Sequence, residues 1–215
     1  MMSIRETMMK KMRVRSAHGV LAAACIAMGA LLAPAVGHAH DGKAHAQWEG
    51  TGDYQRTVRP YAVPDVVLTD ADARPVRLRE LLAGSDPVMM NFVFTTCGTI
   101  CPVMVKVFAD VPAALGAQAA NLRLISISID PDNDTPAQLK TYAKAIGAGE
   151  RWKFLTGRVQ DIKTVQMAFD SYRGDKMNHE PLTLMRQAPG KPWIRIDGFA
   201  TPDELVREYR KVVLQ

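Results

Sequence analysis

This chain of 215 residues has few cysteines and, beyond its N-terminal segment, almost no net charge. Three cysteines are too few for a disulfide-dense miniprotein. The formal charge of +5 is concentrated at the front, because residues 1–39 carry five basic side chains and one acidic side chain. The remaining 176 residues carry 22 basic and 21 acidic groups, so no basic face is left to bind phosphates. We therefore expect no nucleic-acid partner.

Two further absences narrow the function. The chain has no glycine-rich loop that could cradle phosphates and, beyond its N-terminal segment, no Ser/His/Asp set for acyl transfer. Its composition, 47% apolar and 23% charged, is close to that of ordinary globular proteins, which excludes intrinsic disorder and collagen. This composition leaves room for one ordinary hydrophobic core.

The N-terminal segment, residues 1–39, has the layout of a secretory signal peptide. A basic stretch precedes an apolar run at 19–37, and Gly37-His38-Ala39 offers a small-x-small cleavage site, so the exported chain would start near His40. The alternative is an uncleaved membrane anchor, because about 18 apolar residues can span a bilayer. Pro34 and the alanine-rich composition favour cleavage.

Residues 40–59 have little apolar periodicity and several glycine and charged residues, so we predict a flexible tether that does not pack. His38, His40 and His45 form a local cluster that either binds a metal transiently or belongs to a solvated linker, and we prefer the linker. Cys25 lies inside the apolar run. We assign it no chemistry, because a lipoprotein site would want a larger residue three positions earlier.

The rest of the chain, residues 60–215, alternates predicted strands and helices, which indicates a single α/β domain without internal repeats. A hairpin opens it, a nearly continuous apolar run suits a strand covered on both faces, and two helices begin with capping boxes. We predict strands at 65–68, 76–78, 88–94, 122–129, 152–155, 182–185 and 193–196, and helices at 102–118, 136–146, 159–172 and 202–214.

Cys97 and Cys101 lie where the apolar strand passes into a helix that begins near Pro102. Helix N-termini favour anions, so a thiolate here should have a lowered pKa. The carboxyl ends of strands are also where open α/β folds place their sites. In an exported protein this pair can persist as a disulfide, and a plain structural disulfide is one alternative for it.

The three residues between the cysteines make a loop that can close as a disulfide or open to clasp an ion. Two thiolates rarely complete a metal site, and the only histidine beyond residue 45 is His179. Sulfur and imidazole ligands favour copper, with zinc the main competitor. His179 could also be an ordinary polar loop residue, and the residues alone leave these alternatives open.

Other candidate ligands are weaker. The run 130–134 (DPDND) resembles a hard-cation loop, but its proline and the capping box that follows favour a turn and a helix start over calcium. Met89, Met90 and Met104 could offer thioethers near the cysteines, although core packing is the usual role of methionine.

Several segments together resemble the Sco/SenC family of copper-binding thioredoxin-fold proteins. They are the run 95–104 (TTCGTICPVM), the run 126–147 (SISIDPDNDTPAQLKTYAKAIG), the FLTG of 154–157 and the downstream His179. The resemblance covers roughly residues 61–214. It implies a thioredoxin-like α/β fold, a central mixed sheet flanked by helices with an N-terminal hairpin extension. It further implies that Cys97, Cys101 and His179 bind one Cu(I) or Cu(II).

The resemblance also implies a function, a periplasmic copper chaperone for the dinuclear copper centre of cytochrome c oxidase. Its partners would be the copper-receiving subunit and a thiol reductant, with a possible membrane tether at the N-terminus. Asn178 and Glu180 depart from the Asp and Ser that commonly flank the family's histidine, which puts the client in doubt. The alternative is a thiol-disulfide oxidoreductase or peroxidase with Cys97 as the attacking thiolate and Cys101 as its resolving partner.

Overall fold

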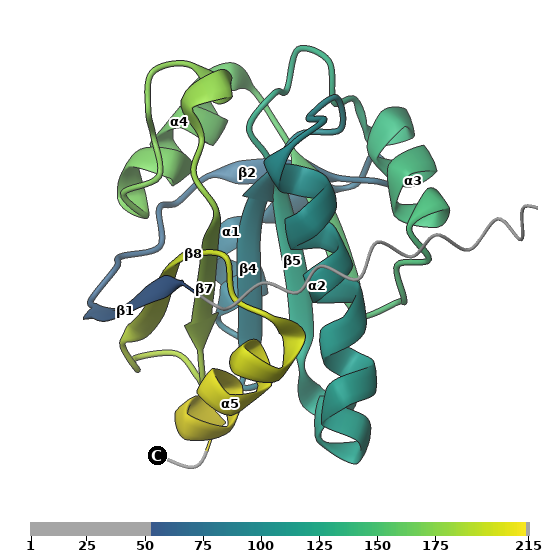
Figure 1. Cartoon of the computed structure of the whole chain (residues 1–215). Coiled ribbons are helices and arrows are strands. Elements are labelled where there is room, and N and C mark those ends of the chain that lie inside the picture. Colours follow the sequence, from purple (N-terminus) through teal and green to yellow (C-terminus); the bar gives the residue numbers. More distant parts are fainter. Residues whose placement is uncertain (1–52, 214–215) are drawn as a thin grey trace, which may run out of the picture. The chain divides into compact units, whose positions relative to one another are not determined.

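A computed structural model describes residues 53–213 (Figure 1). An eight-stranded mixed sheet runs through this part of the chain in the order β1-β8-β7-β4-β5-β6-β2-β3. The strands are β1 (Tyr54–Arg59), β2 (Val67–Asp70), β3 (Pro75–Arg77), β4 (Val88–Val93), β5 (Arg123–Ser128), β6 (Trp152–Thr156), β7 (Leu182–Arg186) and β8 (Trp193–Gly198). The helices are α1 (Leu78–Leu82), α2 (Ile100–Leu115), α3 (Pro136–Ala145), α4 (Val159–Ala168) and α5 (Pro202–Val213), with 3-10 turns η1 (Gly116–Asn121) and η2 (Lys176–Asn178).

The centre of the sheet is built from strands whose residues are buried on both faces. All six residues of β4 are buried, as its continuous apolar run predicts. β4 pairs parallel with β5 and antiparallel with β7. Helices α2 and α5 pack against each other over one face of the sheet (Figure 1). Because β7 is antiparallel to β4, the carboxyl end of β4 lies beside the start of β7. The predicted site residues occur near these two strand ends.

Most of the predicted elements are confirmed. β2 and β3 form the predicted antiparallel hairpin. Thr135 caps α3 by accepting a hydrogen bond from the Gln138 backbone N–H at 3.3 Å. Thr201 and Glu204 form a reciprocal capping box at the start of α5.

Three helix boundaries differ from prediction by two residues or more, and one of them is the end of α2 at Leu115, three residues early. α2 begins at Ile100, which places Cys101 inside its first turn and Pro102 at its third position. Proline fits there because the first helical N–H groups have no partner within the helix. α4 ends at Ala168, four residues early, because Phe169 is fully buried and Asp170 adopts a left-handed φ of +52°.

The predicted tether is wrong over residues 54–59, which form the edge strand β1. This strand pairs antiparallel with β8 along its whole length. Apart from Val58 its side chains are polar, so it has no apolar periodicity, and its backbone pairs with β8. A Cβ at Gly198, whose φ is +104°, would lie 2.5 Å from the Asp53 carbonyl oxygen, so this close pairing requires glycine.

The predicted signal peptide or anchor, the histidine cluster and Cys25 lie outside the described residues. Within residues 53–213, one helical segment, Ile100–Asn121, is long and apolar enough to cross a membrane. It consists of α2 and η1, and α2 contributes seven residues to the hydrophobic core.

Candidate metal centre

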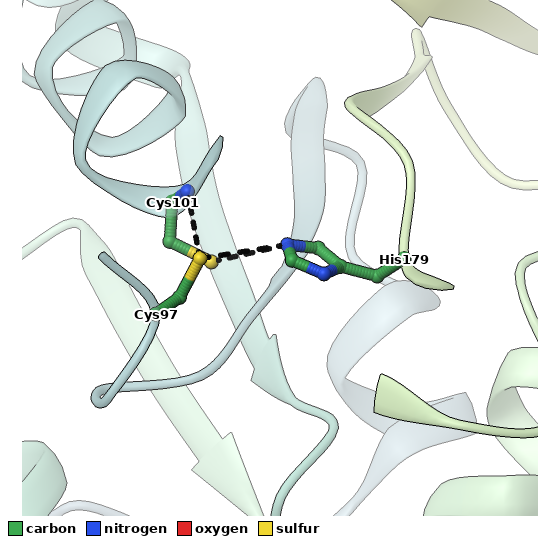
Figure 2. A group of neighbouring side chains, drawn as sticks. All are labelled: Cys97, Cys101 and His179. Atoms are coloured by element: carbon green, nitrogen blue, oxygen red, sulfur yellow. Dashed lines mark hydrogen bonds between the residues drawn. The ribbon is translucent and has the colours of Figure 1, made fainter. Parts of the chain in front are cut away.

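Three side chains from separate segments converge at the carboxyl end of β4 (Figure 2). Cys97 lies in the loop between β4 and α2, Cys101 lies in the first turn of α2, and His179 directly follows η2. The Nε2 atom of His179 lies 3.8 Å from the Cys97 sulfur and 3.5 Å from the Cys101 sulfur. The three potential ligand atoms all lie within 4.8 Å of one another. The chain therefore brings together all three residues that we predicted as ligands.

The two cysteines are free thiols in different environments. Cys101 is fully buried, whereas Cys97 is partly exposed. Burial raises the pKa of the Cys101 thiol, and the neighbouring Cys97 adds to this effect. Burial also opposes ionisation of Cys97, but hydrogen bonds from the backbone N–H groups of Cys101 and Thr99 outweigh it and lower the pKa of Cys97. Cys97 thus ionises before Cys101.

His179 is buried, and its ring has a defined orientation. Its Nδ1 atom lies 2.8 Å from the Lys176 carbonyl oxygen, so Nδ1–H donates and the lone pair of Nε2 faces the sulfurs. The Phe94 ring contacts the imidazole edge-on, with centroids 5.0 Å apart. Burial lowers the pKa of His179 and outweighs the hydrogen bond to Lys176, which favours the neutral form that binds metals.

The cysteine loop is held by a buried carboxylate. Both oxygens of Asp134 lie close to the Thr95 backbone N–H, at 3.1 and 3.2 Å, and its Oδ1 accepts the Thr95 hydroxyl at 2.5 Å. The Ser128 hydroxyl donates to the same carboxylate at 2.6 Å. Asp134 therefore fixes the backbone two residues before Cys97.

The run 130–134 is a turn that leads into α3, as we predicted in preference to a calcium loop. The backbone N–H groups of Asn133 and Asp134 both donate to the Asp130 carbonyl, which closes this turn. Hydrogen bonds inside the protein occupy the carboxylates of Asp130 and Asp134. Met89, Met90 and Met104 are buried in the core, which is the packing role we expected.

Sequence reasoning missed the residues that orient the candidate ligands. Lys176 acts on His179 through its backbone carbonyl, which any residue carries, so no residue type signals this contact. Asp134 could have been noticed, because it is the third aspartate of the run 130–134 and directly precedes the helix cap Thr135. Nothing in the sequence indicated that its partner is Thr95.

The donor set restricts the ions that fit. Two sulfurs and one imidazole nitrogen form a soft, three-coordinate arrangement that suits copper, and Cu(I) in particular. Structural zinc sites usually have four ligands. Within residues 53–213, the cluster of His, Cys, Asp and Glu side chains that could hold a metal contains only these three residues.

Comparison with known proteins identifies the family. The model of the SCO1/SenC family matches residues 56–214. The SCO1 protein homolog of Bacillus subtilis (strain 168) is 37% identical over 101 residues, which are 46% of this chain and 51% of that protein. The chain thus spans about half the length of the curated relatives it matches.

Two solved structures are similar over most of the described domain. One is BsSco, a member of the Sco family of cytochrome c oxidase assembly proteins described with a disulfide switch (28% identity, TM-score 0.61, 72% of this chain and 94% of that one). The other is copper-bound ScoI of Bradyrhizobium japonicum (25% identity, TM-score 0.57, 70% and 99%). The mixed sheet flanked by helices is thus the thioredoxin-like fold of these proteins, and the chain belongs to the SCO1/SenC family.

Proposed function

We propose that this protein is a periplasmic copper chaperone that serves the assembly of the copper centre of a respiratory oxidase. It binds one copper ion through the thiolates of Cys97 and Cys101 and the Nε2 atom of His179. The observation that carries this proposal is the convergence of these three soft donor atoms within 4.8 Å. The copper-bound ScoI structure and the description of BsSco as an oxidase assembly protein support the cargo and the client.

The residues of the site prepare it for a thiophilic ion. The lone pair of Nε2 is free because Nδ1–H is bonded to the Lys176 carbonyl. Cys97 supplies the first thiolate, and Cys101 gives up its proton only when an ion replaces it. Binding therefore releases protons, so apparent affinity rises with pH. Loading also needs both thiols reduced, which implies a thiol reductant as a second partner.

The location rests on the N-terminal segment. Residues 1–39 carry the basic stretch and apolar run of a secretory leader, so the domain is exported to the periplasm. It is released by cleavage after Ala39 or stays tethered to the inner membrane through the apolar run.

Copper binding to the reduced protein tests the function. We expect one tightly bound copper per wild-type chain, no tight copper in Cys97→Ala, and affinity at least about 100-fold weaker in His179→Ala. The last figure follows because even groups that only orient a ligand contribute about 10- to 100-fold. His45→Ala is the matched control, since it removes a histidine outside the domain, and its affinity should equal that of the wild type. Unchanged stoichiometry in Cys97→Ala would overturn the ligand assignment.

The difference between the two thiols favours one second candidate, a thiol-disulfide oxidoreductase. The Cys97 thiolate would attack a substrate disulfide and release one substrate thiol, and Cys101 would then displace the second to leave a Cys97–Cys101 disulfide. This reaction does not need the imidazole. Turnover of a disulfide substrate that survives His179→Ala in a protein without tight copper would favour the enzyme over the chaperone.

A further inference from the structure

The turn η2, which directly precedes His179, is joined to another part of the domain by the side chain of Lys176. Lys176 reaches across from η2 and donates a hydrogen bond to Asp130 Oδ2, 2.6 Å from its Nζ. Its ammonium also lies 5.6 Å from the centroid of the Phe94 ring. Met177, the next residue, is 69% exposed and gives the turn no comparable anchor.

Lys176 also contacts His179 through its backbone carbonyl. The Lys176 carbonyl accepts hydrogen bonds from both the backbone N–H of His179, at 3.2 Å, and the ring Nδ1–H, at 2.8 Å. The position of this one carbonyl therefore decides where the imidazole lies and which nitrogen keeps its proton. Because the ammonium and the carbonyl belong to one residue, loss of the ion pair with Asp130 leaves the backbone that carries the acceptor free to shift.

Asp130 is a rigid anchor for this lysine. It is 5% exposed, and Asn133 Nδ2 donates to both carboxylate oxygens at 3.0 Å. Its backbone N–H donates to the Ser128 hydroxyl at 3.0 Å, and that hydroxyl donates to Asp134, which holds the cysteine loop. One turn at the end of β5 thus supports both halves of the site.

We propose that Asp130 and Lys176 are positioning residues that hold the His179 imidazole in the Nδ1–H form with Nε2 directed at the two thiols. This inference rests on the proposed function only where copper affinity is concerned. The alternative is an ion pair that stabilises the fold without affecting the imidazole. The two roles differ in a measurable way, because only positioning changes the ring.

The first measurement uses the reduced, copper-free protein and the ¹⁵N resonances of the His179 ring. We expect a single Nδ1–H tautomer in the wild type and a mixture of tautomers in both Lys176→Met and Asp130→Asn. Lys176→Arg should keep the wild-type pattern, because a guanidinium can still bond Asp130. The matched control is Lys140→Met, which breaks a lysine–aspartate pair of 2.9 Å with Asp72 away from the site. It should leave the ring unchanged.

Copper affinity is the second measurement. We expect Lys176→Met to bind copper about 10- to 100-fold more weakly, the usual effect of losing a group that orients a ligand, and Lys176→Arg to recover most of the loss. Unfolding midpoints of all variants identify any that fail to fold. Wild-type tautomers in folded Lys176→Met and Asp130→Asn would overturn the inference. If the wild type binds no copper, the proposed function fails, and the ring resonances still decide the role of Asp130 and Lys176.

Discussion

The two cysteines illustrate how position within a few residues decides reactivity. Cys97 precedes helix α2, and its sulfur accepts a hydrogen bond from the Cys101 backbone N–H. Cys101 lies one turn further on and is buried in the core. A thiolate is stabilised by donors and destabilised by removal from water. The pKa values of the two thiols therefore move in opposite directions, although the residues are four positions apart.

This difference predicts selective alkylation of the reduced, metal-free protein near neutral pH. Haloacetamides react with thiolates, so we expect Cys97 to be modified first, by at least about tenfold, which corresponds to a pKa difference of about one unit. The rate at Cys97 should rise through a pKa below the usual 9.0 of a thiol. Peptide mass spectrometry identifies the modified residue.

Cys97→Ser provides the control for selective alkylation. Its remaining thiol should react slowly in the folded protein and rapidly in denaturant, because unfolding exposes Cys101. Equal rates at the two cysteines of the folded wild type would contradict the assigned environments.

At the scale of single elements, the edge strand β1 depends on a buried carboxylate. Glu208 of α5 is 2% exposed and accepts hydrogen bonds from Arg56 Nε at 2.7 Å, Tyr54 Oη at 3.2 Å and Lys211 Nζ at 2.7 Å. Burial acts to raise the pKa of Glu208, but these hydrogen bonds outweigh it and lower the pKa. Two of the donors belong to β1, so this carboxylate links the strand to α5.

We expect Glu208→Gln to lower the free energy of unfolding by about 1.5–3 kcal/mol at neutral pH, the usual contribution of hydrogen bonds to a charged group. A carboxylate with a lowered pKa stabilises the fold fully above its unfolded value of about 4.5. That stabilisation is lost as the pH falls through the folded value. The difference in unfolding free energy between the wild type and Glu208→Gln should therefore narrow below about pH 4.5. Urea unfolding at several pH values measures this difference.

Glu80→Gln is the matched control for this buried carboxylate. Glu80 faces Arg77 at 3.7 Å with its side chain 77% exposed, so the variant should stay within about 0.5 kcal/mol of wild type. If the difference in unfolding free energy between the wild type and Glu208→Gln does not change with pH, packing and not the charge of Glu208 holds the strand.

The elements that could be predicted from the sequence are those with a strong local pattern of apolar or capping residues. The apolar run of β4 and the capping boxes of α3 and α5 each encode their structure within a few residues. β1 could not be found this way, because its partners, β8 and Glu208, lie more than 130 residues away. Residue types and spacing singled out Cys97, Cys101 and His179 as candidates, and the resemblance to the Sco/SenC family completed them as a ligand set. Lys176 acts through a carbonyl and has no residue signature.

For the whole domain, the site and the β1 edge lie in separate places on one sheet. The proposed ligands come from the β4–α2 loop, the first turn of α2 and the residue after η2, whereas β1 borders β8 at the end of the strand order. An unpaired edge strand is a template for association with other chains. Losing β1 should therefore affect stability and self-association more than copper binding.

Two truncated proteins, starting at residues 53 and 60, test where the domain begins. The longer protein keeps β1, so we expect the cooperative unfolding and single copper of the whole chain. The shorter protein lacks β1, exposes the edge of β8 and leaves Glu208 without Arg56 and Tyr54. Its free energy of unfolding in urea should fall by at least about 2 kcal/mol, and sedimentation should reveal self-association. Its folded fraction should still bind one copper per chain, because all three ligands remain. Equal unfolding free energies for the two proteins would mean that β1 does not contribute to the stability of the folded domain.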